Sequence, residues 1–170
     1  MKDHVSPVAA AGPRPDREEF LNRMIGSLSE TIEDVVGVED AESFIGVVGR
    51  RIGNSDLAEM PATEDVDAKS VGDHLAEFKR RIGGEFQVTS IDGATVTFEN
   101  TRCPFGAEVT GRTSLCQMTT NVFGRVAANA TGYANVCVHK AISRGDPTCV
   151  VTVRLAREAK EDDGGQDFYG

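Results

Sequence analysis

The sequence predicts an α+β domain in which an antiparallel four-stranded sheet packs with an N-terminal three-helix layer, with one more helix between the two strand pairs. Three observations carry this prediction. Apolar residues recur every three to four positions in the first half of the chain, they alternate over four segments of the second half, and a helical pattern separates these segments into two pairs. A length of 170 residues suits a single domain.

Three helical segments are expected before the sheet, and a glycine follows each of them. The first begins with Asp16 and Glu19, which fit a capping box. The third ends in a basic triplet that suits the negative end of the helix dipole, a simpler role than phosphate binding. These segments are 17–36, about 40–52, and 67 or 70 to 82.

Two strand pairs and a fourth helix complete the expected domain. Asp92-Gly93 between two alternating segments predicts a two-residue hairpin turn, with Val96 and Phe98 facing the core. The strands are expected at 85–91, 94–100, 133–140 and 148–156, and the helix from 113 or 114 to about 130.

The ends of the chain differ from the domain in composition. We expect a flexible leader over 1–15, one domain over 16–156 and an acidic disordered tail over 157–170. The net charge of −9 disfavours direct nucleic-acid recognition, which needs a basic face. The sequence contains neither a signal peptide nor an apolar run that could span a bilayer, so we expect a cytoplasmic protein without membrane contact.

The cysteines are the main candidates for a functional site. Cys149 opens the last strand and shares the core-facing parity of Val151, Cys116 lies in the first turn of the fourth helix, and Cys103 lies in the loop before it. Each is therefore at an element end, where a shared site can form. The alternative is that all three are ordinary buried thiols. By parity Cys137 faces the other side of the sheet, and we expect no role for it.

Three thiolates would need a fourth partner for tetrahedral zinc, or could hold an iron–sulfur cluster with an exchangeable position. Asp146 is a possible oxygen ligand, although in Gly145-Asp146-Pro147 an aspartate more often shapes the turn. Neither a P-loop lysine nor a hydrolytic triad is evident in the sequence.

Several motifs of the second half resemble the methanogen output domain family, which is similar to the vinyl-reductase-type small-molecule sensor domains. The similarity covers roughly 20–155, and the motifs are Cys103-Pro-Phe-Gly106, Gly111-Arg-Thr-Ser-Leu-Cys116, Gly132-Tyr-Ala and Arg144-Gly-Asp-Pro-Thr-Cys149. The resemblance implies an antiparallel sheet with packed helices, often dimeric, that serves as a sensor or output module.

The resemblance also implies a cysteine-rich zinc site in the related sensors, to which Cys116 and Cys149 correspond. Another cysteine usual there falls on Ala141 here, and Cys103 is the candidate replacement.

We therefore expect a non-enzymatic sensory or regulatory domain that senses redox state or a small molecule. Its metal or cluster site would be Cys103, Cys116 and Cys149, and it would signal through a homodimer or a signalling or transcription-regulatory partner. Two alternatives stay open: an enzyme or accessory factor of tetrapyrrole metabolism, and a metal-free cysteine redox switch.

Overall fold

The computed structural model describes residues 16–61, 66–157 and 164–170. Over these residues the protein has an α+β fold of four α-helices and a five-stranded antiparallel sheet, which confirms the predicted fold class. The helices are α1 (Arg17–Val36), α2 (Val38–Gly53), α3 (Ala68–Arg81) and α4 (Cys116–Thr131). The strands are β1 (Phe86–Asp92), β2 (Thr95–Asn100), β3 (Tyr133–Lys140), β4 (Cys149–Arg154) and β5 (Gln166–Tyr169). Short 3-10 helices are η1 (Gly106–Val109), η2 (Thr113–Leu115) and η3 (Ile142–Arg144).

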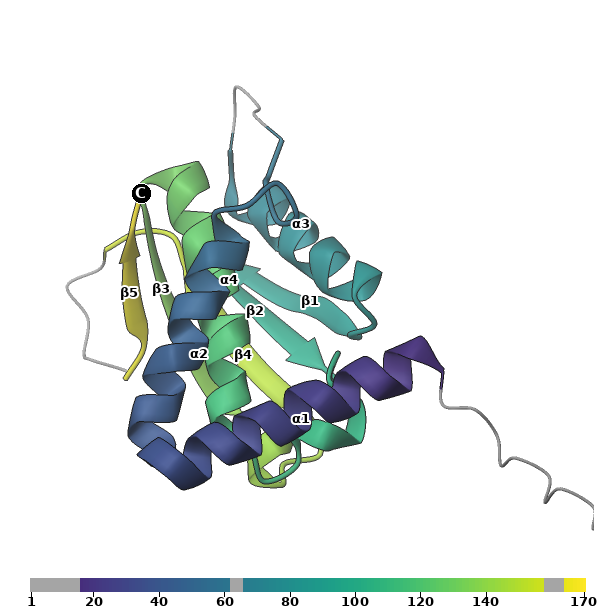
Figure 1. The fold of residues 1–170 in the computed structure, drawn as a ribbon. Coiled ribbons are helices and arrows are strands. Elements are labelled where there is room, and N and C mark those ends of the chain that lie inside the picture. Colours follow the sequence, from purple (N-terminus) through teal and green to yellow (C-terminus); the bar gives the residue numbers. More distant parts are fainter. Residues whose placement is uncertain (1–15, 62–65, 158–163) are drawn as a thin grey trace, which may run out of the picture.

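The strands are ordered β1-β2-β4-β3-β5 and each neighbouring pair is antiparallel. Helix α3 packs on β1 and β2, whereas α4 packs on β3 and β5. Helix α2 packs on α4, and α1 packs on α2. Figure 1 shows the helices on one side of the sheet, with α1 running crosswise to α2. The helices thus form an inner pair, α3 and α4, and an outer pair, α1 and α2.

This arrangement corrects the expected three-helix layer. Helix α3 buries Val71, Leu75 and Phe78 directly against the sheet side of the core. The residues that α1 buries are small, and α2 approaches α4 through a row of glycines. A Cβ on Gly49 would lie 2.8 Å from the Cβ of Asn121 in α4. The glycines allow the outer helix to come this close, and helical periodicity alone does not distinguish such an outer helix from an inner one.

The fifth strand corrects the expected four-stranded sheet. The composition predicts a disordered tail over 157–170, yet Gln166–Tyr169 pairs with β3. Phe168 is buried beside Gly124 of α4, where an added Cβ would lie 2.1 Å from its ring. The strand is stabilised by this distant contact, which the local charge of the segment does not reveal. Residues 158–163 of the tail and the expected leader 1–15 lie outside the described residues.

One core lies between the sheet and the inner helices. Phe98, Phe123 and Val153 are fully buried in it, and Phe98 and Phe123 have ring centroids 5.1 Å apart. Phe86 completes the aromatic cluster, with its ring centroid 5.4 Å from that of Phe123. These contacts position the end of the sheet where β2 stops and β4 begins.

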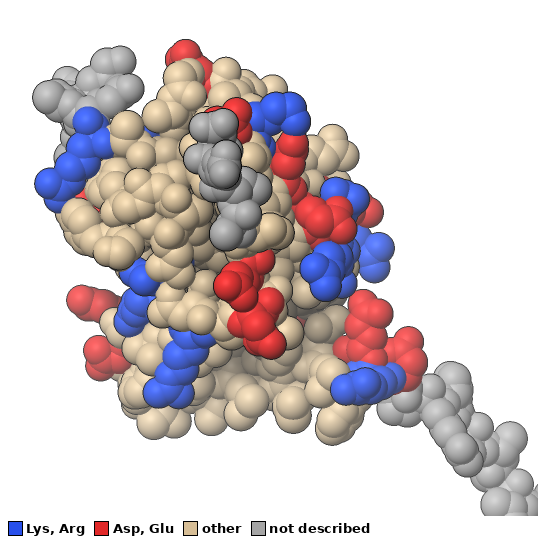
Figure 2. Space-filling model, turned by 90° about the horizontal axis from the view of Figure 1, so that it is seen from above, with Lys and Arg blue, Asp and Glu red and all other residues tan. Residues whose placement is uncertain are grey.

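The surface charge and the apolar character of the helices relate to the partners and the membrane contact expected from the sequence. On the face seen in Figure 2, Lys and Arg form separate groups among Asp and Glu and make no continuous basic surface there. None of the helices in the described parts of the chain has the length and apolar character needed to cross a bilayer.

Candidate functional site

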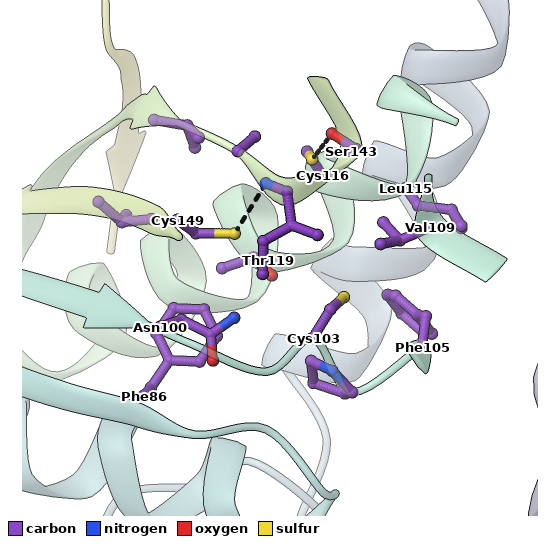
Figure 3. Close-up of a pocket in the computed structure, with 15 residues that line it drawn as sticks. Phe86, Asn100, Cys103, Phe105, Val109, Leu115, Cys116, Thr119, Ser143 and Cys149 are labelled. Atoms are coloured by element: carbon purple, nitrogen blue, oxygen red, sulfur yellow. Dashed lines mark hydrogen bonds between the residues drawn. The ribbon is translucent and has the colours of Figure 1, made fainter. Parts of the chain in front are cut away.

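One cavity at the end of the sheet is lined by three of the four cysteines (Figure 3). Cys103 follows β2 in the loop before η1, Cys116 is the first residue of α4, and Cys149 is the first residue of β4. The cavity is narrow, with about 30 Å³ of free interior space, so a ligand larger than water must displace lining side chains to enter it. We call it the cysteine cavity. Its other lining residues are Phe86, Asn100, Pro104, Phe105, Val109, Leu115, Thr119, Val138, Ala141, Ile142, Ser143 and Val151.

The pairing of β2 with β4 explains how Cys149 reaches this cavity. Asn100 and Cys149 are partners across the two strands. Two residues further along, Phe98 and Val151 are also partners and are buried. Since alternate residues of a strand share a face, Asn100 and Cys149 point to the helical side, as the alternation of β4 predicts for Cys149.

Two of the thiols have partners in the turn η3. The Sγ of Cys116 lies 2.9 Å from the Oγ of Ser143, and the N–H of Ile142 donates to the Sγ of Cys149 at 3.4 Å (Figure 3). Burial raises the pKa of Cys103 to about 11. It also raises the pKa of Cys116, against the lowering effect of the Ser143 bond. Cys103 and Cys116 are therefore protonated at neutral pH.

The described residues give no support to the metal site expected from the sequence. Over residues 16–61, 66–157 and 164–170, no three or more Cys, His, Asp or Glu side chains form a group that could hold a metal ion. Cys103, Cys116 and Cys149 border one space without being grouped as ligands. Ala141, where the related sensors have a further cysteine, contributes only a methyl group to the lining. The expectation that the three thiols jointly hold zinc or an iron–sulfur cluster gains no support from this geometry.

The other sequence candidates have local roles. The Oδ2 of Asp146 accepts a hydrogen bond from the N–H of Ala141 at 2.8 Å, so this carboxylate shapes the turn. Cys137 is buried on the opposite face of the sheet from Cys149, as parity predicts, with its Sγ 3.8 Å from Nδ1 of His139.

A buried lysine contacts two residues that line the cysteine cavity, Phe86 and Thr119, and the sequence analysis did not single it out. Lys79 of α3 is only 1% exposed, and its Nζ donates to the Oγ1 of Thr119 at 2.9 Å. The same Nζ lies 5.4 Å from the ring centroids of both Phe86 and Phe123, a distance typical of cation–π contacts. Burial lowers the pKa of Lys79 to about 8, and the thiols that oppose this effect are those of the cavity. The ammonium thus faces the cavity wall.

Lys79 belongs to a run of three basic residues, and this context made its buried position hard to predict. Its neighbours Arg80 and Arg81 are exposed, as expected of charged residues at a helix end that faces solvent. Position 79, however, follows Leu75 by one helical turn and therefore lies on the buried face. Ile82, which the spacing assigned to that face, is 47% exposed because the helix has ended. The 3.6-residue periodicity of the helix therefore predicts that position 79 is buried, whereas the charge of the lysine predicts exposure to solvent.

Asn100 presents a second polar group to the cavity. Its Oδ1 accepts hydrogen bonds from the backbone N–H groups of Glu85 at 3.0 Å and Arg102 at 3.3 Å. These bonds fix the orientation of the amide, since the opposite orientation would bring its NH₂ against two donors. The Nδ2 is buried without a hydrogen-bond partner and is drawn on the cavity side in Figure 3. Leaving such a donor unpaired costs about 1–3 kcal/mol.

A wider apolar groove adjoins the cysteine cavity. Phe105 and Leu115 line both spaces and separate them. The groove has about 620 Å³ of free interior space, and Lys79 lines this groove. We call it the helical groove. Its other apolar lining comes from Ile25, Leu28, Ile32, Ile45, Val48, Ile52, Leu57, Phe78, Ile82, Met118 and Val122.

Comparison with known proteins identifies related sequences and folds. Residues 24–154 match the sequence family described as Methanogen output domain 1. No curated protein matches the chain in sequence.

Two solved structures have a similar fold. One is the phenol-responsive sensory domain of the transcription activator PoxR with phenol, with a TM-score of 0.63 and 15% identity, covering 79% of this chain and 74% of that chain. The other is trafficking protein particle complex subunit 3 from Naegleria fowleri covalently bound to palmitic acid, with a TM-score of 0.57 and 18% identity, covering 85% of this chain and 98% of that chain. At these identities the likeness concerns the fold alone.

Proposed function

Because the chain belongs to the methanogen output domain 1 family, we propose that it is a sensory domain that binds a small organic molecule in the cysteine cavity. The observation that carries the proposal is a pair of buried polar groups: the Nδ2 of Asn100, which lines the cavity, and the Lys79 ammonium, which is bonded to the lining residue Thr119. Both are costly to the fold while the cavity is empty. A ligand that pairs with them explains why a folded domain keeps them.

The fold neighbours support a ligand with an apolar body. One of them is described with phenol and the other with palmitic acid. In this chain, the walls of the cysteine cavity include Phe86, Val109 and Leu115, and the helical groove is largely apolar. Apolar walls with a few converging polar groups are typical of small-molecule sites.

We propose that the signal leaves through α1 and α2, to a second copy of the chain or to a signalling or transcription-regulatory partner. Both outer helices expose apolar side chains at helical spacing, a pattern that favours a protein contact. They are Phe20, Met24 and Leu28 on α1, and Phe44, Val47 and Val48 on α2. Leu28 and Val48 also line the helical groove, which connects this surface with the site.

Other functions predicted from the sequence compete for the same cysteines. A zinc or iron–sulfur site for Cys103, Cys116 and Cys149 predicts metal in anaerobically purified protein, whereas our proposal predicts none; about one zinc or one cluster per chain would favour the metal site. A thiol switch needs a reactive thiolate, which the raised pKa of Cys103 and Cys116 disfavours.

Titration with small apolar molecules tests the proposal directly. The probes are phenol, benzyl alcohol, benzoate, 1-butanol and butyrate, added to the full chain while amide NMR signals and the melting temperature are recorded. We expect saturable shifts at Thr119 and Ser143, together with a rise in melting temperature. Val138→Phe fills the cavity and should abolish the shifts. The matched control Val150→Phe changes the opposite face of the sheet and should retain the shifts.

Binding of all five probes without saturation, or equal binding to the filled and control variants, would show that the cavity is not the site.

A further inference from the structure

Two polar groups at the cysteine cavity can act only as donors toward it: the Asn100 amide in its lining, and the Lys79 ammonium behind the lining residue Thr119. An ammonium such as that of Lys79 only donates, and the Oδ1 of Asn100 is already occupied by two backbone donors, which leaves its NH₂ for the cavity. Of the described residues that line the cavity, none is an aspartate or a glutamate. The cavity therefore has donors and a positive charge beside it, but no fixed anion.

The charge of Lys79 is incompletely balanced within the fold. Its Nζ has one hydrogen bond, to Thr119, and two aromatic faces. The ionisable groups that act on it are Cys103, Cys116 and Cys149. The protonated thiols of Cys103 and Cys116 supply no negative charge, and aromatic rings attract a cation more weakly than a carboxylate does. A buried ammonium in this position attracts an anion.

We propose that the ligand is a small organic carboxylate whose oxygens accept hydrogen bonds from Lys79 and Asn100 and whose apolar body packs against Phe86, Val109 and Val151. This inference rests on the proposed function, since it names the class of molecule that the cavity takes. A carboxylate has one negative charge and two acceptor atoms, which matches one ammonium and one amide donor. A phosphate brings more charge than a single lysine in an apolar cavity can balance.

Matched pairs of probes isolate the contribution of the carboxylate. Benzoate is compared with benzyl alcohol, and butyrate with 1-butanol, by calorimetric titration of the full chain near neutral pH. We expect each carboxylate to bind about tenfold or more tightly than its alcohol, because a charge-assisted hydrogen bond replaces a neutral one. Equal affinities within a pair would overturn the inference and leave the proposed function standing. Binding of no probe would overturn both.

Two variants test the residues that hold the carboxylate. Lys79→Met should remove the preference for benzoate over benzyl alcohol, whereas Lys69→Met, an exposed position of the same helix, should preserve it. Asn100→Asp keeps an oxygen to accept from Glu85 and Arg102 but replaces the NH₂ donor by a second oxygen. This variant should bind benzoate about tenfold or more weakly, because two carboxylates repel, and its affinity for benzyl alcohol should change little.

If Lys79→Met does not fold, as judged from its NMR spectrum, Asn100→Asp decides the question. Unchanged benzoate binding in Asn100→Asp would show that the carboxylate is not held there.

Discussion

Among single residues, Lys79 imposes the clearest cost on the fold. Burial lowers its pKa from 10.5 to about 8. Below pH 8 both the folded and the unfolded chain hold the proton, so the fold bears the full cost of the buried charge. As the pH rises from about 8 to about 10.5, the folded state releases its proton first and this cost disappears. The lysine therefore makes the protein relatively more stable in alkaline solution.

Lys79→Met tests this cost. Methionine keeps the length of the side chain without its charge, so we expect the free energy of unfolding at neutral pH to rise by up to about 3 kcal/mol. The advantage over wild type should shrink as the pH approaches about 10.5. Urea unfolding of both proteins over this pH range measures the difference. Because the Lys79 charge also lowers the pKa of Cys103, both proteins are compared in a Cys103→Ser background, which removes this coupling. An advantage that grows with pH would contradict a buried charged lysine.

Cys103 should react slowly despite lying beside a cavity. Its pKa is raised from 9.0 to about 11, so its thiolate fraction at pH 8 is about 100-fold below that of an ordinary thiol. We expect iodoacetamide to modify Cys103 about 100-fold more slowly in the folded protein than in urea, followed by peptide mass spectrometry. A cysteine introduced at the exposed position 90, Ser90→Cys, provides the reference rate. Equal rates at the two positions would instead favour the redox switch.

At the scale of elements, β5 packs on α4 through the ring of Phe168, which lies against Gly124. Phe168→Ala removes the buried ring of β5, and we expect the free energy of unfolding to fall by about 3 kcal/mol. Gly124→Ala should also destabilise the protein, because its Cβ would overlap the Phe168 ring. Gln166→Ala, an exposed change in the same strand, should alter stability by less than about 0.5 kcal/mol. Urea unfolding compares the three variants. Similar values for Phe168→Ala and Gln166→Ala would show that β5 does not stabilise the domain.

Element boundaries were largely predictable because their signals are local. The predicted first helix and α1 coincide, and the N–H of Glu19 donates to the Oδ1 of Asp16 at 2.7 Å as the capping pattern predicts. The hairpin is confirmed between β1 and β2, but its two-residue turn is Gly93-Ala94 rather than Asp92-Gly93, because Asp92 pairs with Thr95. A register shift between Val88 and Ser90 interrupts this hairpin, and strict alternation did not predict it.

At the scale of the whole molecule, the exposed apolar side chains of α1 and α2 lead us to expect a homodimer. Phe44 is 56% exposed on α2, so Phe44→Glu should convert the dimer to a monomer without loss of helical content. Size-exclusion chromatography with light scattering measures the mass. Ile91→Glu, which changes an apolar residue that is 43% exposed on the hairpin, is the matched control and should stay dimeric. A monomeric wild-type protein at micromolar concentration would contradict this expectation and direct the search to another partner.

The sequence by itself determined the periodic elements, their caps and turns, and the face of β4 on which Cys149 lies. These signals act between residues within about one helical turn or across one hairpin, so they can be read without knowing the rest of the fold. The α+β class follows from them.

Only the tertiary structure decided which faces meet. It placed Lys79 inside, oriented the amide of Asn100, added β5 to the sheet, and arranged three thiols around a cavity without grouping them as metal ligands. The physical reason is common to all four outcomes. Burial and hydrogen-bond pairing depend on contacts between segments far apart in the chain, and those contacts can override the preference of a lysine for solvent or of an acidic tail for disorder.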